Sequence, residues 1–312
     1  MLDIIGKRKY YIGVSLALAI ASIVALIYPG LKLGVDFTSG TTMTIKFGGD
    51  PGTAAIRAAF TASGHDEAVV QHTSGAEYFI RTAELPEPGG REAVEAAIKS
   101  KINGNYSVLE VSTVGASVAR ETIRTAILAT AVGSVFVMLY IMYSFRTVPS
   151  SYRYAIAAIV PILHDILITM GVFAVLGKTI GAEVNAIFVV GVLTLIGYTV
   201  NNTIVVFDRI RENVRIAPAR PFAQTVNLAI SETLARNLNT SITTLIAILA
   251  MLLLGGSTMR DFLIILFVGL CVGLYGSTFI AAQMVVAWES GEFGRWLRFW
   301  RRRKAQPQPE QA

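Results

Sequence analysis

The chain has 312 residues, of which 53% are hydrophobic and only 15% are charged, and its formal net charge is +6. Its mean hydropathy of +0.57 is higher than that of soluble domains of similar length. This composition excludes an ordinary water-soluble domain and predicts an integral membrane protein. The single cysteine, Cys271, excludes an internal disulfide.

Six apolar stretches are long enough to cross a bilayer as helices, which takes about 20 residues. They cover residues 11–28, 122–145, 154–176, 184–207, 238–254 and 262–288. The first stretch follows Lys7, Arg8 and Lys9 and offers no convincing small-residue cleavage site. We therefore expect a retained anchor rather than a signal peptide that is removed.

Lysine and arginine gather in alternate connections between these stretches. They lie in residues 1–10, in 146–153, in an amphipathic connection at 208–237 and in a basic tail at 289–312. The opposite short loops hold only Lys178 and Arg260. Because excess positive charge marks cytoplasmic loops, both termini are expected in the cytoplasm. This topology accounts for the net charge, so a nucleic-acid partner is not expected.

Residues 29–121 contain no long apolar helix and are expected to form an extracytoplasmic domain. Alternating or helical periodicity predicts, in order, a strand at Thr41–Phe47, a helix at Pro51–Ser63, a hairpin of Ala68–His72 with Tyr78–Arg81, a helix at Arg91–Ile102 and a strand at Tyr106–Val114. This β-α-β-β-α-β order is that of the ferredoxin-like fold. The predicted fold class is a polytopic α-helical membrane protein, a six-helix bundle with a ferredoxin-like α+β extracytoplasmic domain.

No residue pattern in the chain is typical of an enzyme or a cofactor site. The sequence has no nucleophile elbow, phosphate-binding loop or nucleotide fingerprint. His65 and His72 lack cysteines or a carboxylate cluster at ligand spacing, so we expect surface residues rather than metal ligands. The sequence therefore predicts no catalytic activity, no cofactor and no metal.

Two ionisable residues lie in the middle of the third apolar stretch. His164 and Asp165 follow Pro161, which frees a backbone carbonyl and allows the helix to bend. A charged side chain inside a bilayer costs several kcal/mol and needs a reason to be there. Two interpretations stay open: a buried hydrogen-bonded pair that fixes helix packing, and a pair that handles protons.

Polar residues also mark the facing ends of the fourth and fifth stretches. On the fourth they recur at spacings of three and four, at Thr194, Tyr198, Asn201 and Asn202. On the fifth they are Arg236, Thr240, Thr243 and Thr244. The pattern predicts a polar seam between two antiparallel helices near the cytoplasm. Alternatively, Arg236 extends to the lipid headgroups as one more cytoplasmic charge.

Four segments together resemble a known family. They are GVDFTSGT at 34–41, LHD at 163–165, GYTVNNTIVVFDRIREN at 197–213 and ARNLNTSITTL at 235–245. These motifs are similar to those of the SecF family of protein-export subunits, which is related to the resistance-nodulation-division transporters. The motif residues that match are Gly34, Asp36, Phe37, Gly40, Asp208, Arg209, Arg211, Glu212 and Asn213.

The resemblance implies a subunit of the bacterial cytoplasmic membrane that pairs with SecD beside the SecYEG channel, with a YidC-type insertase as a further possible partner. It implies that the proton-motive force drives the extracytoplasmic domains to move a translocating preprotein outward. Two alternatives are a scaffold that assists translocation and insertion without using energy, and a small-molecule exporter of the same superfamily.

The resemblance also implies a proton path, and here the sequence departs from the family. The candidate path residues are Asn202, Arg236, Asp165, His164, Asn201, Tyr198 and Thr240. The family motif reads Asn-Asp-Thr, so Asn202 stands at the position of the aspartate, while Arg236 matches the family arginine. Because an amide cannot release a proton, coupling would use Asp165 or a carboxylate of the partner, unless the amide is an introduced change that holds one state. Ser39 replaces a family glycine, which matters only if that position needs a positive φ.

Overall fold

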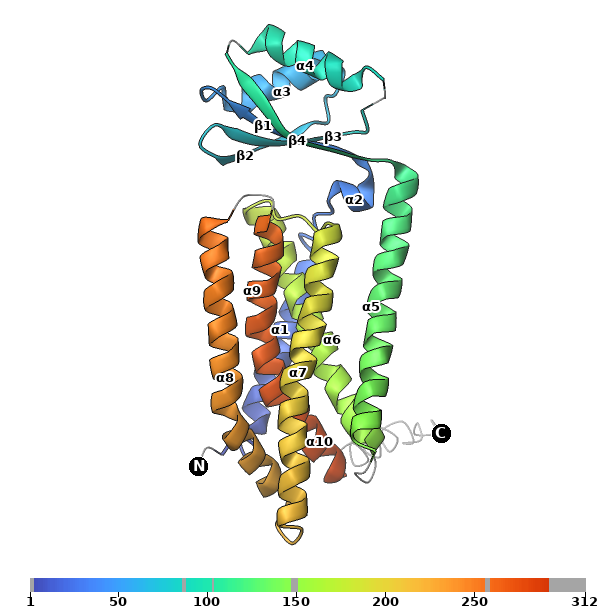
Figure 1. Ribbon diagram of the computed structural model, residues 1–312, viewed down its shortest axis with the longest axis vertical. Helices are drawn as coiled ribbons and strands as arrows, with labels where there is room; N and C mark the ends of the chain where they lie inside the picture. Colours follow the sequence, from blue (N-terminus) through green and yellow to red (C-terminus); the bar gives the residue numbers. More distant parts are fainter. Residues whose placement is uncertain (1–2, 86–87, 103, 147–150, 256–258, 292–312) are drawn as a thin grey trace, which may run out of the picture.

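The computed structural model describes residues 3–85, 88–102, 104–146, 151–255 and 259–291. Six helices in this part of the chain are long and apolar enough to cross a membrane, and they run side by side with a small domain at one end (Figure 1). They are α1 (Arg8–Ile27), α5 (Ala116–Ser144), α6 (Ser151–Thr179), α7 (Ala186–Ile216), α8 (Phe222–Leu254) and α9 (Arg260–Tyr275), the last continued by η2 (Gly276–Ala281) and α10 (Ala282–Glu289). The predicted six-helix bundle is confirmed.

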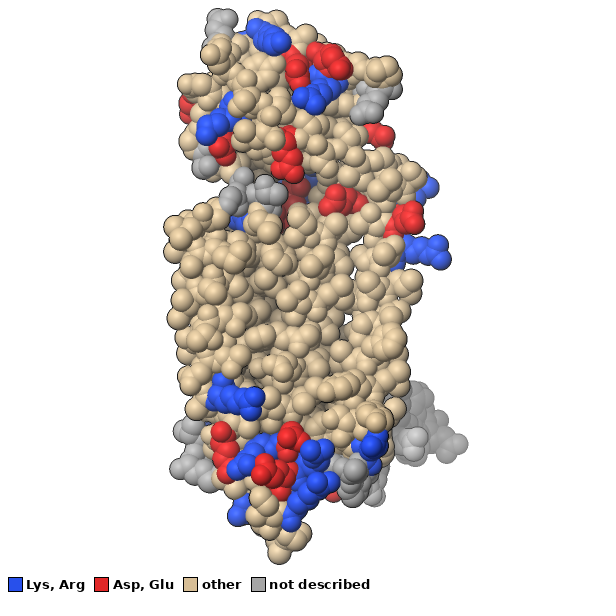
Figure 2. Space-filling model, viewed as in Figure 1, with Lys and Arg blue, Asp and Glu red and all other residues tan. Residues whose placement is uncertain are grey.

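The surface of the bundle is that of a membrane protein. Charged side chains gather near its two ends and on the outer domain, and the band between them is almost free of charge (Figure 2). On the membrane helices Leu16 of α1, Phe136 of α5 and Ile246 of α8 are each at least 60% exposed. Large apolar side chains on such a continuous surface are stable against lipid and not against water. The chain is therefore a multi-pass membrane protein.

Two of the long helices extend beyond the predicted apolar stretches. Within residues 208–237, predicted as an amphipathic connection, α7 continues to Ile216 and α8 begins at Phe222. Only residues 217–221 are non-helical there. The amide of Asn185 caps the other end of α7 by accepting a hydrogen bond from the Phe188 N–H at 2.9 Å. Most of the predicted basic tail lies outside the described residues.

The outer domain is a four-stranded antiparallel sheet with two helices on one face, as the periodicity predicted. Its elements are β1 (Gly40–Phe47), α3 (Gly52–Ala62), β2 (Val69–Ser74), β3 (Glu77–Thr82), α4 (Gly90–Lys101) and β4 (Tyr106–Val114). The strand order is β2-β3-β1-β4, that of the ferredoxin-like fold. Met43, Ile45 and Ile80 of the sheet pack with Ile56 and Phe60 of α3 in its core, and all five are fully buried.

The other face of the sheet is turned toward the helix bundle (Figure 1). The short helix α2 (Val35–Thr38) connects α1 to β1 at this junction. Arg81 of β3 donates to the Leu33 carbonyl at 2.6 Å, and Lys32 pairs with Glu183, which precedes α7, at 2.9 Å. These contacts hold the sheet above the outer ends of the helices.

Ser39 has a backbone conformation that side chains rarely adopt, with φ 63° and ψ 164°. This region is almost restricted to glycine and costs other residues about 1–3 kcal/mol. The family glycine at this position therefore has a conformational reason. We expect Ser39→Gly to raise the thermal unfolding temperature of the chain in detergent by a few degrees. Ser63→Gly is the matched control, because the φ of Ser63 is −92° and its hydroxyl bonds the Phe60 carbonyl; a gain as large in this variant would refute strain at Ser39.

A carboxylate of the outer domain makes its stability depend on pH. Glu67 accepts hydrogen bonds from the Ala83 N–H at 3.1 Å and the Thr82 hydroxyl at 2.9 Å. The backbone N–H of Glu67 itself, followed by these two donors, lowers the pKa of the Glu67 carboxyl from 4.5 to about 2. Because the folded-state pKa is depressed, the stabilisation is present above about pH 4.5 and is lost as the pH falls toward 2.

Glu67→Gln should therefore lower the unfolding temperature of the chain at pH 7 and have little effect near pH 2. Thermal unfolding in detergent at the two pH values measures this. Asp66→Asn, at the exposed neighbouring position, is the control and should change neither value. An equal loss at both pH values for Glu67→Gln would show that the charge of the carboxylate is not what matters.

Candidate functional site

Asp165 lies at the centre of the bundle, where α6 meets α7 and η2. Its side chain is fully buried. One carboxylate oxygen lies 3.0 Å from His164 Nδ1, and the other accepts a hydrogen bond from the Thr199 hydroxyl at 3.0 Å. An ionisable group at this depth is costly unless it is bonded or functional. The carboxylate is thus bonded on both oxygens and remote from either water phase.

Glycines on α9 and η2 make room for this carboxylate. An added Cβ at Gly276 would overlap the Asp165 carboxylate, and one at Gly273 would lie 2.7 Å from Thr199 Oγ1. Gly276 begins the π-helical turn η2, a rare geometry that is frequent at functional sites. The backbone of the last membrane helix therefore approaches Asp165 as closely as its carboxylate permits.

His164 extends the site toward α1. Its ring stacks on Tyr275 of α9 with 6.4 Å between centroids, and the Tyr275 hydroxyl donates to the Tyr11 carbonyl at 2.7 Å. The other ring nitrogen, Nε2, is buried without a hydrogen-bond partner among the described residues. The structure thus brings His164 and Asp165 together, as expected of either interpretation of the pair.

The predicted seam between the fourth and fifth stretches exists between α7 and α8, but its α8 side was wrong. Tyr198 donates to Ser241 at 2.6 Å, and Asn202 is 2% exposed. The residues of α8 that are buried there are Thr233, Asn237 and Ser241, at spacings of four. Five of the residues predicted in the seam are exposed instead: Thr194, Asn201, Arg236, Thr240 and Thr243.

The error has a simple geometric cause. Successive residues of an α-helix are rotated by about 100°, so Arg236 is exposed beside a cavity near the cytoplasm, whereas Asn237 is buried against α7. The hydroxyl groups of Thr194 and Thr240 are satisfied within their own helices, by the carbonyls of Val190 and Arg236. Asn237 and Thr199 were missed, although their regular spacing with Ser241 and Asn202 could have identified them.

The motif that follows Asn202 fixes the cytoplasmic ends of the helices. Arg209 pairs with Glu232 of α8 at 2.7 Å and with Glu212 at 2.6 Å, and Asn213 donates to Glu232 at 2.8 Å. Arg211 pairs with Asp208 at 2.5 Å and lies over the Phe145 ring. A cavity of about 590 Å³ opens beside this network and is lined in part by Asp208, Glu232, Thr233 and Arg236.

The motif at residues 34–41 likewise fixes the outer ends of the helices. Gly34 N–H donates to the Val184 carbonyl at 2.7 Å, and Asp36 accepts from the first N–H of α7, that of Ala186, at 2.7 Å. Phe37 packs on the main core of the bundle. Gly40 has φ 130°, and an added Cβ would lie 2.6 Å from the Thr82 carbonyl. These motif residues therefore join α1, α7 and the sheet.

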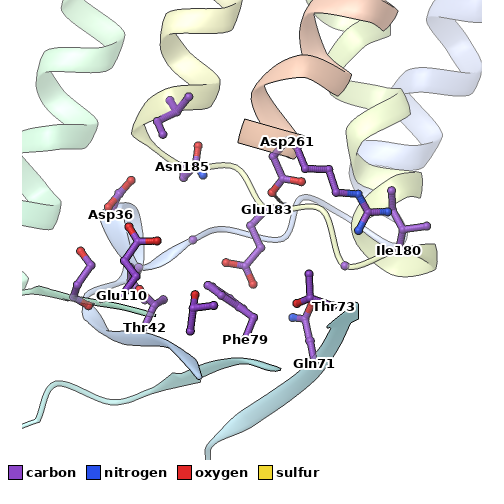
Figure 3. Close-up of a pocket in the computed structure, with 17 residues that line it drawn as sticks. Asp36, Thr42, Gln71, Thr73, Phe79, Glu110, Ile180, Glu183, Asn185 and Asp261 are labelled. Carbon is purple, nitrogen blue, oxygen red and sulfur yellow. Dashed lines mark hydrogen bonds between the residues drawn. The ribbon is translucent and has the colours of Figure 1, made fainter. Parts of the chain in front are cut away.

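A second cavity, of about 350 Å³, lies between the sheet and the outer ends of the helices (Figure 3). Thr42, Gln71 and Phe79 line it from the strands, and Glu183 and Asp261 line it from the bundle (Figure 3). Glu183 pairs with Lys32, and its N–H donates to Asp261 at 3.0 Å. Because these two carboxylates already have partners, we interpret them as contacts that hold the outer domain on the bundle. This cavity is therefore the weaker candidate for the functional site.

Comparison with known proteins supports the resemblance. Residues 93–291 match the family "Protein export membrane protein SecD/SecF, C-terminal", and residues 24–50 match the SecD/SecF GG motif. The "Protein translocase subunit SecF" of Thermobaculum terrenum is 38% identical over 97% of this chain and 98% of its own length. The "Protein translocase subunit SecDF" of Bacillus subtilis is 34% identical over 93% of this chain and 38% of its own.

A solved structure agrees with the fold as well. The crystal structure of SecDF from Thermus thermophilus, titled a translocon-associated membrane protein, superposes with a TM-score of 0.81 at 32% identity and covers 93% of this chain. This chain spans 39% of that SecDF chain, about the share it spans of the Bacillus protein. The chain therefore belongs to the SecD/SecF family of protein export membrane proteins and matches its SecF members.

Proposed function

We propose that this Sec protein-export subunit is coupled to protons, and that Asp165 binds and releases the proton. Its partner is a SecD subunit, since the similar SecDF proteins contain a SecF-like part within a longer chain. The pair lies in the bacterial cytoplasmic membrane beside SecYEG, with a YidC-type insertase as a further partner. Both termini are in the cytoplasm, in keeping with the distribution of basic residues.

The observation that carries the proposal is the burial of Asp165. Its carboxylate has 0% exposure, yet its two bonds come from His164 and Thr199 and from no arginine or lysine among the described residues. A carboxyl without a fixed counter-charge gains little from staying ionised in the bundle. It can therefore change protonation with modest cost, and the bonds to α6 and α7 transmit that change to both helices.

The position of Asp165 also suggests how the chain could carry a proton although Asn202 stands where the family has an aspartate. Thr199, which bonds Asp165, lies one helical turn from Asn202 on the same buried face of α7. An acid contributed by α6 thus lies within about one turn, 5.4 Å along the axis, of where the family acid would be. Moving the acid from position 202 to Asp165 would therefore leave the proton-binding group at about the same depth in the membrane.

The experiment is preprotein export in vesicles that contain the chain, its SecD partner and SecYEG. A proton gradient across the membrane should accelerate export, and an uncoupler should remove that acceleration. A vesicle lacking only this chain supplies the background. If the chain increased the export rate equally with and without the gradient, proton coupling would be rejected.

A second candidate is a scaffold that supports translocation without using energy. The observation that favours it is Asn202, because an amide at the family's acidic position cannot release a proton. In the same vesicles a scaffold would stimulate export equally after the uncoupler is added. The two functions therefore give opposite results in one experiment.

A further inference from the structure

Three buried amides among the described residues of the bundle lack hydrogen-bond partners: that of Gln283 on α10, and two that lie on the neighbouring helices α7 and α8. Nδ2 of Asn202 and Nδ2 of Asn237 are inaccessible to solvent and bond no atom of the described chain, and both residues are 2% exposed. Buried polar groups in proteins nearly always have a partner, either protein or ordered water. A polar site with several such groups is one where a water molecule is held rather than excluded.

The register of α7 and α8 places the two amides on facing turns. Tyr198 of α7 bonds Ser241 of α8 at 2.6 Å, and nearer the cytoplasm Asn213 of α7 bonds Glu232 of α8 at 2.8 Å. The two helices are antiparallel (Figure 1). Four residues onward on α7 and four residues back on α8, about one turn from the Tyr198 bond, therefore lead to Asn202 and Asn237. Both lie on the buried faces through which α7 and α8 meet.

This pair is close to the cytoplasmic cavity. Thr233 and Arg236, one turn before and one residue before Asn237, both line that cavity. Asp208, Glu212 and Glu232 line it as well, together with Arg209. Such a charged lining holds water, so hydrated space extends to within about one helical turn of the two amides.

On its other side the pair adjoins the turn of α7 that bonds Asp165. Thr199, three residues before Asn202 on the same face, donates to the Asp165 carboxylate at 3.0 Å. One water molecule beside Asn202 therefore reaches the neighbourhood of Thr199 and the carboxylate.

No comparable polar route leads from Asp165 along α7 and α9 to the outer side. Every buried residue of α7 from Ala186 to Ile196 is apolar, and so is every buried residue of α9. Phe173 and Phe188 pack edge to face with 4.7 Å between centroids, and Leu195 lies against Gly269. Along these two helices the polar side of the site is therefore the cytoplasmic side.

We propose that Asn202 and Asn237 together hold a water molecule through which Asp165 exchanges its proton with the cytoplasmic cavity. A water oxygen can accept a bond from each amide while its own hydrogens remain free to be passed on. Asn237 is then a positioning residue, which acts on the water and not on the carboxyl itself. The inference rests on the proposed function, because it names the route by which the proposed carrier is reached.

The first test is proton flux into vesicles that contain the chain with its SecD partner. Asn237→Leu fills the site with an apolar side chain of similar size and should reduce the Asp165-dependent flux at least about tenfold, equivalent to about 1.4 kcal/mol in the barrier. Asn237→Ser, which still binds water, should retain most of it. Asn239→Leu on the exposed side of α8 is the matched control and should behave like the parent.

Copurification with SecD and the unfolding temperature should be unchanged in Asn237→Leu, which separates a lost water from a lost fold. Unreduced flux in that variant would overturn the inference while leaving proton coupling intact. A second measurement decides the water site even if the parent conducts no protons: a structure of the chain with SecD should show ordered density within hydrogen-bond distance of both amides. Direct bonding between the amides, with no such density, would also overturn it.

Discussion

Gly276→Ala is expected to abolish gradient-driven export. The added methyl group would occupy the space of the Asp165 carboxylate, and the Gly276 backbone lies in the π-helical turn that packs on α6. Overpacking of this kind costs about 1–3 kcal/mol and displaces the side chains it meets. Because the displaced group is the proposed proton carrier, the loss of coupling should exceed the loss of stability. Export in vesicles and thermal unfolding in detergent measure the two effects.

Gly197→Ala is the matched control, since an added Cβ there meets nothing within 4 Å and alanine favours the helix. It should export as the parent does. The double variant Gly276→Ala with Asp165→Ala removes the overlap, so it should recover stability but not coupling. Gradient-driven export at the parent level in Gly276→Ala would show that the close approach to Asp165 has no functional importance.

Asn202→Asp is expected to raise proton flux and gradient-driven export. The replacement is nearly isosteric, and its carboxyl would lie on the buried face between Thr199 and the cytoplasmic cavity, opposite the Nδ2 group of Asn237. A second ionisable group on this route provides an additional step for the proton. A reduction of the barrier by about 1.4 kcal/mol would raise the flux about tenfold.

Asn201→Asp is the control for the added charge, because Asn201 is the neighbouring residue but is exposed. It should leave the flux unchanged. The exposed position of Arg236 further predicts that Asn237→Leu removes the gain of Asn202→Asp more completely than Arg236→Ala does. Equal flux in the parent and in Asn202→Asp would remove position 202 from the proton route.

Much of the fold could be predicted because its signals are local. Apolar stretches of about 20 residues predict membrane helices without knowledge of their neighbours. In the outer domain, the alternation of Thr41–Phe47 and the helical spacing of Ile56, Ala59 and Phe60 each predicted an element that the structure contains. In both cases one face of the element is buried, and the sequence period reports that face directly.

The contacts of the site could be predicted only in part, because they depend on how helices are rotated against each other. Arg236 and Asn237 are adjacent in sequence, yet one is exposed and the other buried. The close approach of Gly276 to Asp165 joins residues more than a hundred positions apart and depends on a π-helical turn. No local pattern in the sequence specifies these relations, whereas the two candidate ionisable residues in α6 were evident from their cost in lipid.

The central claim, that Asp165 carries the proton, is tested most directly by proton flux in vesicles that contain the chain with its SecD partner. Asp165→Asn keeps the shape of the side chain and can still accept a hydrogen bond from Thr199, but it cannot release a proton. Asp66→Asn, on the exposed surface of the outer domain, is the control for loss of a carboxylate. The account predicts that Asp165→Asn reduces the flux to that of vesicles without the chain, while Asp66→Asn remains close to the parent; parent-level flux in Asp165→Asn would contradict it.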